Sequence, residues 1–171
     1  YFHNRFNNCK IINMYGITET TVHVTYKEIT DYEIEENLSD IGVAIPTLGL
    51  MLVDSRLKPV PKGIQGEIIV WGHGVCRGYL NRPELTSEKF VDIDIDSNGN
   101  KVRVYRSGDA GRYINNGLEY IGRIDQQVKI RGHRIELAEI KNSILKNDKI
   151  EDCVVIVDAD ADDNRTIIAY Y

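Results

Sequence analysis

The sequence contains little cysteine, and its cysteines are far apart. Cys9, Cys76 and Cys153 form no Cys-x-x-Cys pair, and their number is odd. This spacing does not suit a disulfide framework or a zinc site, and it is typical of reduced thiols in a cytoplasmic protein. The four histidines are scattered and include no His-Glu-x-x-His sequence, so nothing in the sequence indicates a zinc enzyme.

Long hydrophobic runs and an excess of positive charge are also missing. No apolar run approaches the roughly 20 residues that span a bilayer. The formal net charge of −5 argues against general nucleic-acid binding, which requires a basic face. The first residues, Tyr-Phe-His-Asn-Arg, include neither an initiator Met nor a signal peptide. We therefore expect this sequence to come from the interior of a longer protein.

What remains is the composition of an ordinary globular protein, with 42% hydrophobic and 27% charged residues in 171 positions. A chain of this length suits one domain or two small ones and can bury roughly 70% of its unfolded surface. Period-two alternation and short apolar runs predict strands, and two segments have helix signals. The predicted strands are 10–14, 22–27, 49–53, 66–72, 102–106, 111–114, 118–121, 128–130, 153–157 and 166–170, and the predicted helices start near residues 83 and 136.

Several polar segments are interpreted as loops. Residues 28–40 are acidic with little periodicity and predict an exposed connector. Residues 94–99 and 158–163 have the first spacings of a calcium loop but lack its later ligands, so both are interpreted as solvated acidic turns. Residues 107–109, Ser-Gly-Asp, predict a turn, and Asn115–Gly117 predicts a type I′ hairpin connection.

Residues 122–136 are the most informative stretch: Gly-Arg-Ile-Asp-Gln-Gln-Val-Lys-Ile-Arg-Gly-His-Arg-Ile-Glu. A basic run of this kind is commonly only a solvated hairpin. The string nevertheless resembles the Gly-Arg-x-Asp-x-Gln-Val-Lys-Ile-Arg-Gly hinge of adenylate-forming enzymes, specifically the amino-acid adenylation domains of nonribosomal peptide synthetases. This resemblance implies that Asp125 is the pivot between two subdomain orientations. It also implies that Arg123 holds the ribose or phosphate and that Lys129 faces the site in the second orientation.

Residues 13–21, Asn-Met-Tyr-Gly-Ile-Thr-Glu-Thr-Thr, are similar to the family's Asn-x-Tyr-Gly-Pro-Thr-Glu motif, with Ile17 at the usual proline. A tyrosine ring offers a flat face on which adenine can stack. By resemblance this role falls to Tyr15, with Gly16 beside it. A threonine hydroxyl can donate to phosphate, and a carboxylate is a hard oxygen ligand that Mg²⁺ prefers. These roles fall to Thr18 and Glu19.

Two further segments match the family in its order. Residues 105–109, Tyr-Arg-Ser-Gly-Asp, are similar to a motif whose Asp accepts hydrogen bonds from both ribose hydroxyls, a role that falls to Asp109. Tyr120, just before the hinge, is assigned to the same nucleotide site. The third segment, Gly66–Gly72 followed by Arg77-Gly78-Tyr79, also resembles the family, and we interpret it as a structural hairpin.

The resemblance implies an α+β fold in which residues 1–124 form the β-rich, distorted barrel-like part of the large AMP-binding subdomain. Residues 125–171 would be the hinge and an incomplete small subdomain. The implied activity is ATP- and Mg²⁺-dependent activation of an amino acid as aminoacyl-AMP, followed by transfer to the phosphopantetheine thiol of a carrier domain. Neighbouring synthetase domains are the expected partners, and neither nucleic acid nor membrane is expected.

The resemblance also bears on the substrate and on the activity of the chain itself. In this family, pocket-lining positions fall on Met14, Val22 and His23, a combination that resembles threonine-activating pockets. The family's phosphate loop and late catalytic lysine have no counterpart in the sequence, so the 171 residues alone are expected to be inactive. Two alternatives stay open: an acyl-CoA ligase of the same superfamily, and a noncatalytic nucleotide-binding or scaffold module.

Overall fold

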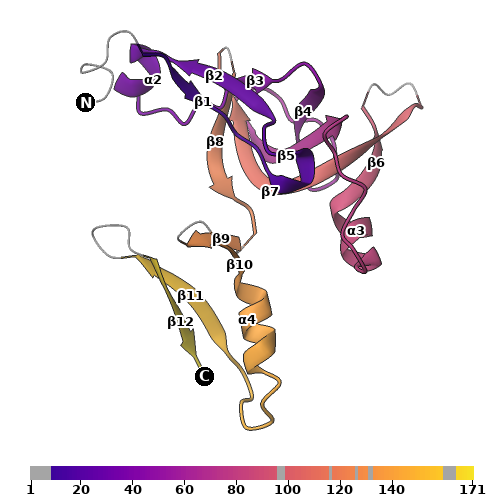
Figure 1. Ribbon diagram of the computed structural model, residues 1–171, viewed down its shortest axis with the longest axis vertical. Coiled ribbons are helices and arrows are strands. Elements are labelled where there is room, and N and C mark those ends of the chain that lie inside the picture. The colour runs from indigo at the N-terminus through magenta and orange to yellow at the C-terminus, as the bar shows by residue number, and fades with distance from the viewer. Residues whose placement is uncertain (1–8, 96–98, 116, 126, 131–132, 160–164) are drawn as a thin grey trace. The chain divides into compact units, whose positions relative to one another are not determined.

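The computed structural model describes the chain over residues 9–95, 99–115, 117–125, 127–130, 133–159 and 165–171 (Figure 1). The chain divides into two compact units, Tyr1–Gly122 and Arg123–Tyr171. Strands dominate both units and a few short helices accompany them, so the predicted α+β class is confirmed. None of the helices in the described part has the length and apolar character that crossing a membrane requires.

The largest sheet of the first unit has five strands. Its order is β4 (Leu48–Val53), β5 (Gln65–Gly72), β7 (Lys101–Tyr113) and β6 (Phe90–Asp94), and β8 (Leu118–Arg123) also pairs with β7. The pairs β4–β5, β5–β7 and β6–β7 are antiparallel. The long strand β7 therefore lies at the centre of the sheet, beside three other strands.

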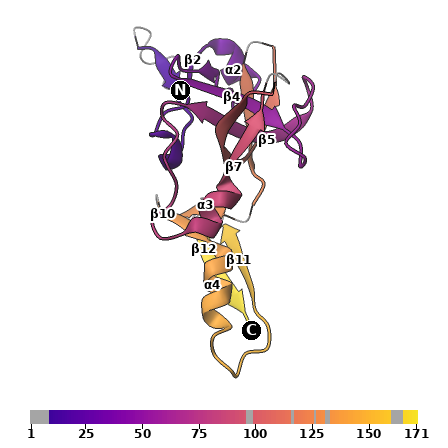
Figure 2. The same cartoon turned by 90° about the vertical axis from the view of Figure 1, so that its right-hand side faces the viewer.

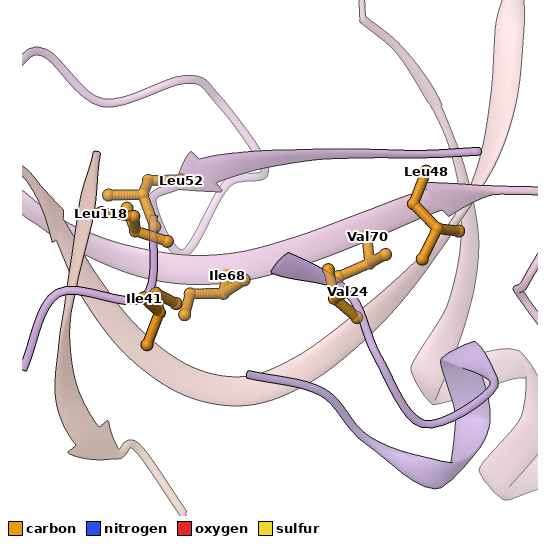
Figure 3. Packing of buried hydrophobic residues seen from close by; sticks show 7 residues of the cluster. All are labelled: Val24, Ile41, Leu48, Leu52, Ile68, Val70 and Leu118. Carbon is orange, nitrogen blue, oxygen red and sulfur yellow. The ribbon is translucent and has the colours of Figure 1, made fainter. Parts of the chain in front are cut away.

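Strand β5 is buried on both faces, which explains its continuous apolar run. Ile68 and Val70 point into one core cluster, whereas Ile69 packs with Val53 and Val104 in a second one. A strand covered on both sides has no reason to alternate apolar and polar residues. Figure 3 shows the first cluster, which joins strands with loop segments of distant sequence and consists of Val24, Ile41, Leu48, Leu52, Ile68, Val70 and Leu118.

A smaller sheet carries the first motif. Its order is β1 (Ile11–Asn13), β2 (Thr25–Ile29) and β3 (Val43–Ala44), and the 3₁₀ helix η1 (Thr18–Thr20) lies between β1 and β2 in sequence. The predicted strand at 22–27 was wrong at its start, because Thr21 and Val22 have φ values of 61° and 72°. Left-handed backbone cannot continue a strand, so β2 begins only at Thr25.

The prediction of an exposed acidic connector at 28–40 holds for most of its residues but missed a helix and two buried carboxylates. The segment contains the helix α2 (Asp31–Glu35), which starts with a capping box formed by Thr30 and Glu33. Glu33 and Asp40 are buried, and both contact the Lys27 ammonium, at 2.6 Å and 3.2 Å. Their charges are paired within the unit instead of being solvated.

The Ser-Gly-Asp turn predicted at 107–109 does not exist as a turn. These residues continue β7, and the pairing register between β5 and β7 shifts between Glu67 and Ile69. Gly108 has a φ of 70°, which is consistent with a local irregularity that keeps the strand continuous. The helix predicted after Pro83 is confirmed as α3 (Pro83–Lys89), with proline in its first turn.

The second unit is a helix on two hairpins. Strands β9 (Gln127–Ile130) and β10 (His133–Glu136) pair antiparallel, and β11 (Val154–Ala159) pairs with β12 (Arg165–Tyr170). The helix α4 (Leu137–Ile144) follows β10 directly and packs on β11, as the two views in Figures 1 and 2 show. The buried residues Leu137, Cys153 and Val155 form the centre of this unit's own core.

Four predicted features lie partly outside the described residues. They are the two acidic loops at 94–99 and 158–163, the Asn115–Gly117 connection, and the hinge, whose positions 126, 131 and 132 are not described.

Candidate functional site

Tyr15 and Asp109, which are 94 residues apart in sequence, are in direct contact. The Tyr15 hydroxyl donates a 2.6 Å hydrogen bond to Oδ2 of Asp109. The other carboxylate oxygen, Oδ1, accepts a longer hydrogen bond of 3.4 Å from the Tyr120 hydroxyl. The two tyrosine rings lie 6.0 Å apart at 36°. The structure thus brings together three of the residues predicted for the nucleotide site, with a buried carboxylate that accepts from two tyrosine hydroxyls.

The backbone around Tyr15 is held by a tight reversal of the chain. The Tyr15 carbonyl accepts from the N–H groups of Val24 and Thr25, at 2.8 Å and 3.1 Å. Its own N–H donates to the Thr25 hydroxyl at 3.3 Å. Gly16 permits this approach, because a Cβ at that position would lie only 1.6 Å from the Val22 carbonyl oxygen. A glycine at position 16 is therefore a geometric requirement of this loop.

Asp109 is positioned by its own strand and by β5. Its N–H donates to the Ser107 hydroxyl at 2.9 Å, and that hydroxyl donates to the Ile68 carbonyl at 2.6 Å. The neighbouring Gly108 N–H donates to Oε1 of Glu67 at 3.1 Å, while Arg106 makes two hydrogen bonds to the other Glu67 oxygen. The Glu67–Arg106 pair thus fixes the strand irregularity from which Asp109 projects.

The pKa of Tyr15 is raised well above its ordinary value. Burial is the main cause, and the adjacent Asp109 charge adds to it by disfavouring a phenolate. The Tyr15 hydroxyl consequently remains protonated and acts as a donor to Asp109 throughout the working pH range of proteins.

Glu19 occupies a second polar centre in the same unit. It lies buried in η1, and its Oε1 accepts a 2.6 Å hydrogen bond from the Tyr79 hydroxyl. The backbone also joins the two segments, since the Cys76 N–H donates to the Glu19 carbonyl at 2.9 Å and the Thr21 hydroxyl to the Gly74 carbonyl at 2.8 Å. The loop that follows β5 is therefore docked against the Thr-Glu-Thr motif.

The residues predicted for the amino-acid pocket are exposed in this structure. Met14, Val22 and His23 all lie at the surface of the first unit, with Val22 at 61% exposure. A β-branched residue at positive φ is rare, so the conformation of Val22 is held by its surroundings and not by its own preference. Thr18 is likewise exposed, beside the buried Glu19.

Arg123 and Asp125 form a local pair in the second unit. Arg123 donates to both carboxylate oxygens, at 2.9 Å and 2.5 Å, and the Gln127 N–H donates to Oδ1 of Asp125 at 3.2 Å. Lys129 lies in β9, opposite Arg134 in the register, and its side chain falls outside the described part of the chain. Within the unit, this pairing ties the start of the hinge to β9.

The chain is similar to several known proteins. The family model described as AMP-binding enzyme matches residues 1–80. A dimodular nonribosomal peptide synthase from Bacillus subtilis (strain 168) is 48% identical over 167 residues, which is 96% of this chain. The solved structure of PA1221, an NRPS protein containing adenylation and PCP domains, is 30% identical, with a TM-score of 0.83 over 98% of this chain. The chain belongs to the AMP-binding enzymes of nonribosomal peptide synthetases.

A third similar protein is a Vibrio cholerae adenylation domain, AlmE, solved in complex with glycyl-adenosine-5'-phosphate. It is 27% identical, with a TM-score of 0.76 over 94% of this chain. The chain spans only part of these proteins: 7% of the dimodular synthase, 34% of the PA1221 chain and 30% of the AlmE chain.

The metal chemistry of an AMP-binding enzyme can be tested against Glu19. Among the described residues there is no group of three or more His, Cys, Asp and Glu side chains that could hold a metal ion. Magnesium at nucleotide sites is commonly bound through one or two carboxylates together with substrate phosphates and water. A single carboxylate therefore fits a cation shared with a nucleotide, and does not fit a cage built from protein alone.

Two residues of the candidate site were missed by the sequence interpretation. Glu67 and Tyr79 belong to segments that we interpreted as structural, yet Glu67 positions the strand of Asp109 and Tyr79 contacts Glu19. Both contacts cross long sequence separations, which no local pattern reveals. The only available signal was that the two segments matched the same family as the predicted site residues.

Proposed function

We propose that this chain supplies the adenosine and metal side of an ATP-dependent adenylation site that activates an amino acid as its aminoacyl adenylate. The observation that carries the proposal is the buried Asp109 carboxylate, held by the hydroxyls of Tyr15 and Tyr120. Its oxygens can accept hydrogen bonds from the vicinal hydroxyls of a ribose. The ring of Tyr15 then supplies an aromatic face for adenine.

In the proposed reaction a carboxylate oxygen of the amino acid attacks the α-phosphorus of ATP. The bond between the α-phosphorus and the bridging oxygen breaks, and pyrophosphate leaves with that electron pair. The Thr18 hydroxyl donates a hydrogen bond to a phosphate oxygen. Glu19 would hold Mg²⁺ through a carboxylate oxygen. A bound Mg²⁺ neutralises charge on the phosphates. Arg123 holds the ribose or phosphate side, so catalysis rests mainly on positioning and charge stabilisation.

We propose residues 1–124 as the large-subdomain part and residues 125–171 as the hinge and small-subdomain part. Asp125 is the pivot, and Lys129 faces the site in the second orientation, in which the aminoacyl group moves from AMP to a phosphopantetheine thiol. The presence of PCP domains beside adenylation domains in the solved PA1221 protein supports a carrier partner. The free cysteines Cys9, Cys76 and Cys153 support a reducing, cytoplasmic location.

For the amino acid, we propose threonine. Met14 and Val22 would provide a small apolar wall, and the His23 imidazole would provide one polar partner. A β-hydroxyl on a short side chain matches such a lining, because a pocket polar group left without a partner is costly. Valine has the same shape as threonine without the hydroxyl and is therefore the appropriate competitor.

Amino-acid-dependent ATP–pyrophosphate exchange by the complete synthetase module that contains this chain tests the proposal. Each of the proteinogenic amino acids is offered separately with ATP, Mg²⁺ and labelled pyrophosphate. We expect exchange, with threonine clearly above valine. Equal exchange with threonine and valine would remove the substrate assignment, and no exchange with any amino acid would contradict the proposed reaction.

A further inference from the structure

Tyr79 connects the loop after β5 to Glu19 through its hydroxyl. The hydroxyl donates to Oε1 of Glu19 at 2.6 Å and lies 3.3 Å from the Tyr105 hydroxyl. Because Glu19 is buried, the hydrogen bond from Tyr79 offsets part of the hydration that the carboxylate loses on folding. A short bond to an ionised acceptor is also among the stronger hydrogen bonds in proteins. The contact therefore restrains the orientation of the Glu19 carboxylate.

Tyr79 itself is held rigidly. Its N–H donates to the Thr86 hydroxyl at 2.9 Å. Its ring packs edge-on against Phe90, with 5.5 Å between the centroids. Gly78 lies so close to α3 that a Cβ would stand 2.4 Å from the Thr86 methyl carbon. The backbone and ring of Tyr79 are thus fixed from several sides. A residue that orients the side chain of another residue needs such rigidity.

We propose that Tyr79 is a positioning residue for Glu19 and sets the affinity of the site for its divalent cation. The inference rests on the proposed function, in which Glu19 is the magnesium ligand. By donating to Oε1, Tyr79 fixes the rotation of the carboxylate and thus the direction in which its oxygens face a cation. Hydrogen-bond partners of metal ligands act in this way, and their removal typically costs about 10–100-fold in metal affinity.

The experiment measures Mn²⁺ binding by EPR in the complete module saturated with a nonhydrolysable ATP analogue. We compare the wild type with Tyr79→Phe, which keeps the ring packing against Phe90 and removes only the hydroxyl. We expect Tyr79→Phe to weaken Mn²⁺ binding about tenfold, at the low end of the effects seen when hydrogen-bond partners of metal ligands are removed. The half-saturating Mg²⁺ concentration in pyrophosphate exchange should rise in parallel.

A double-mutant cycle separates positioning from a merely structural effect. In a Glu19→Gln background, Tyr79→Phe should cause no further loss of Mn²⁺ affinity, because its action passes through the Glu19 carboxylate. The matched control is Tyr113→Phe, which removes a hydroxyl that accepts from the Leu52 N–H at 3.1 Å, and it should leave Mn²⁺ affinity unchanged. A second variant, Thr86→Val, removes the hydroxyl that accepts from the Tyr79 N–H and leaves Glu19 unchanged. It should also lower Mn²⁺ affinity, but less than Tyr79→Phe does.

The outcomes separate this inference from the proposed function. If the wild-type module binds Mn²⁺ with the nucleotide and Tyr79→Phe binds it equally well, the positioning role is wrong while the function stands. If Tyr79→Phe lowered Mn²⁺ affinity equally in the wild-type and Glu19→Gln backgrounds, the positioning role would also be wrong, and the effect of the hydroxyl would be structural. A wild-type module that neither binds Mn²⁺ with nucleotide nor exchanges pyrophosphate would instead contradict the proposed function.

Discussion

Gly16 determines the shape of the loop that carries Tyr15. Because a Cβ there would stand 1.6 Å from the Val22 carbonyl oxygen, Gly16→Ala forces the reversal of the chain to open. We expect the free energy of unfolding of the 171-residue chain to fall by about 3 kcal/mol, at the upper end of the usual cost of overpacking. Denaturant unfolding followed by circular dichroism measures this change.

The matched control is Gly63→Asn. Gly63 has a φ of +84° and no atom near its missing side chain, and asparagine tolerates left-handed backbone better than most residues. We therefore expect nearly unchanged stability for this variant. If Gly16→Ala and Gly63→Asn were equally stable, the close approach of Gly16 to Val22 would not be a requirement of the fold.

From the sequence, proximity in the fold could be predicted only where family motifs named both residues. Resemblance to a family placed Tyr15 and Asp109 at one site, and the hydrogen bond between them agrees with that placement. No pattern along the chain indicated that Tyr79 would reach Glu19 or that Glu67 would hold the strand of Asp109. These contacts arise from the pairing of β5 with β7 and from loop docking, which depend on the tertiary fold.

At the level of elements, the pair β1–β2 and the helix α2 are joined by a buried charge cluster. Lys27 on β2 contacts Glu33 on α2 and Asp40 just beyond it. The hydrogen bond from Lys27 and a further one from Thr30 lower the pKa of Glu33 from 4.5 to about 2. Folding thus favours the ionised form of Glu33. The cluster stabilises the fold fully at pH values above the ordinary glutamate pKa of 4.5, and this contribution is lost as the pH falls toward about 2.

Lys27→Met tests this cluster. It leaves two buried carboxylates without their shared cation, which should lower the free energy of unfolding at pH 7 by about 3 kcal/mol. Loss of Lys27 also raises the pKa of Glu33 toward its ordinary value, so the decline in stability between pH 5 and pH 2 should become smaller than in the wild type. Urea unfolding at a series of pH values measures both effects.

The neighbouring pair Lys10–Glu28 provides the control on the same sheet. Lys10 is 72% exposed and its contact with Glu28 is solvated, so Lys10→Met should change stability little. An equal loss in the two variants would show that removing any lysine from this sheet, not the buried cluster, is responsible.

Elements were predictable where one local signal dominated. Alternation located β9, and proline in a first turn located α3. The prediction failed for α2, although the sequence Thr30-x-x-Glu33 carries a capping-box signature, because the abundance of acidic residues suggested solvent exposure. It failed for residues 107–109 because turn-forming residue types here build an irregular strand, and the neighbouring strand that imposes this is distant in sequence.

At the scale of the whole molecule, each of the two units has its own buried core. The first is built of two clusters on strands β4, β5, β7 and β8 with nearby loop residues, and the second around Leu137, Cys153 and Val155. The residues that we propose for the nucleotide side, Tyr15, Glu19 and Asp109, all belong to the first unit, whereas Arg123, Asp125 and Lys129 belong to the second. The sequence resemblance indicated two parts, but the cores that define them follow from packing.

We predict that the 171-residue chain by itself does not catalyse ATP–pyrophosphate exchange. It spans 34% of the solved PA1221 chain, and loss of even one preorganised charge-stabilising group can cost about 10²–10³-fold in rate. The assay uses the purified chain with ATP, Mg²⁺ and a mixture of amino acids. Robust exchange would show that the groups sufficient for catalysis all lie within these residues, contrary to the proposed division of the site.

The measurement that tests the central claim most directly is the affinity of the complete module for AMP, determined by calorimetry for the wild type, Asp109→Asn and Asp92→Asn. Asp92 is an exposed carboxylate on β6 of the same sheet and serves as the charge-matched control. Hydrogen bonds to a charged group contribute about 1.5–3 kcal/mol, so Asp109→Asn should weaken AMP binding at least about tenfold. Asp92→Asn should bind AMP like the wild type. Unchanged affinity in Asp109→Asn would contradict the assignment of this site to the adenosine of ATP.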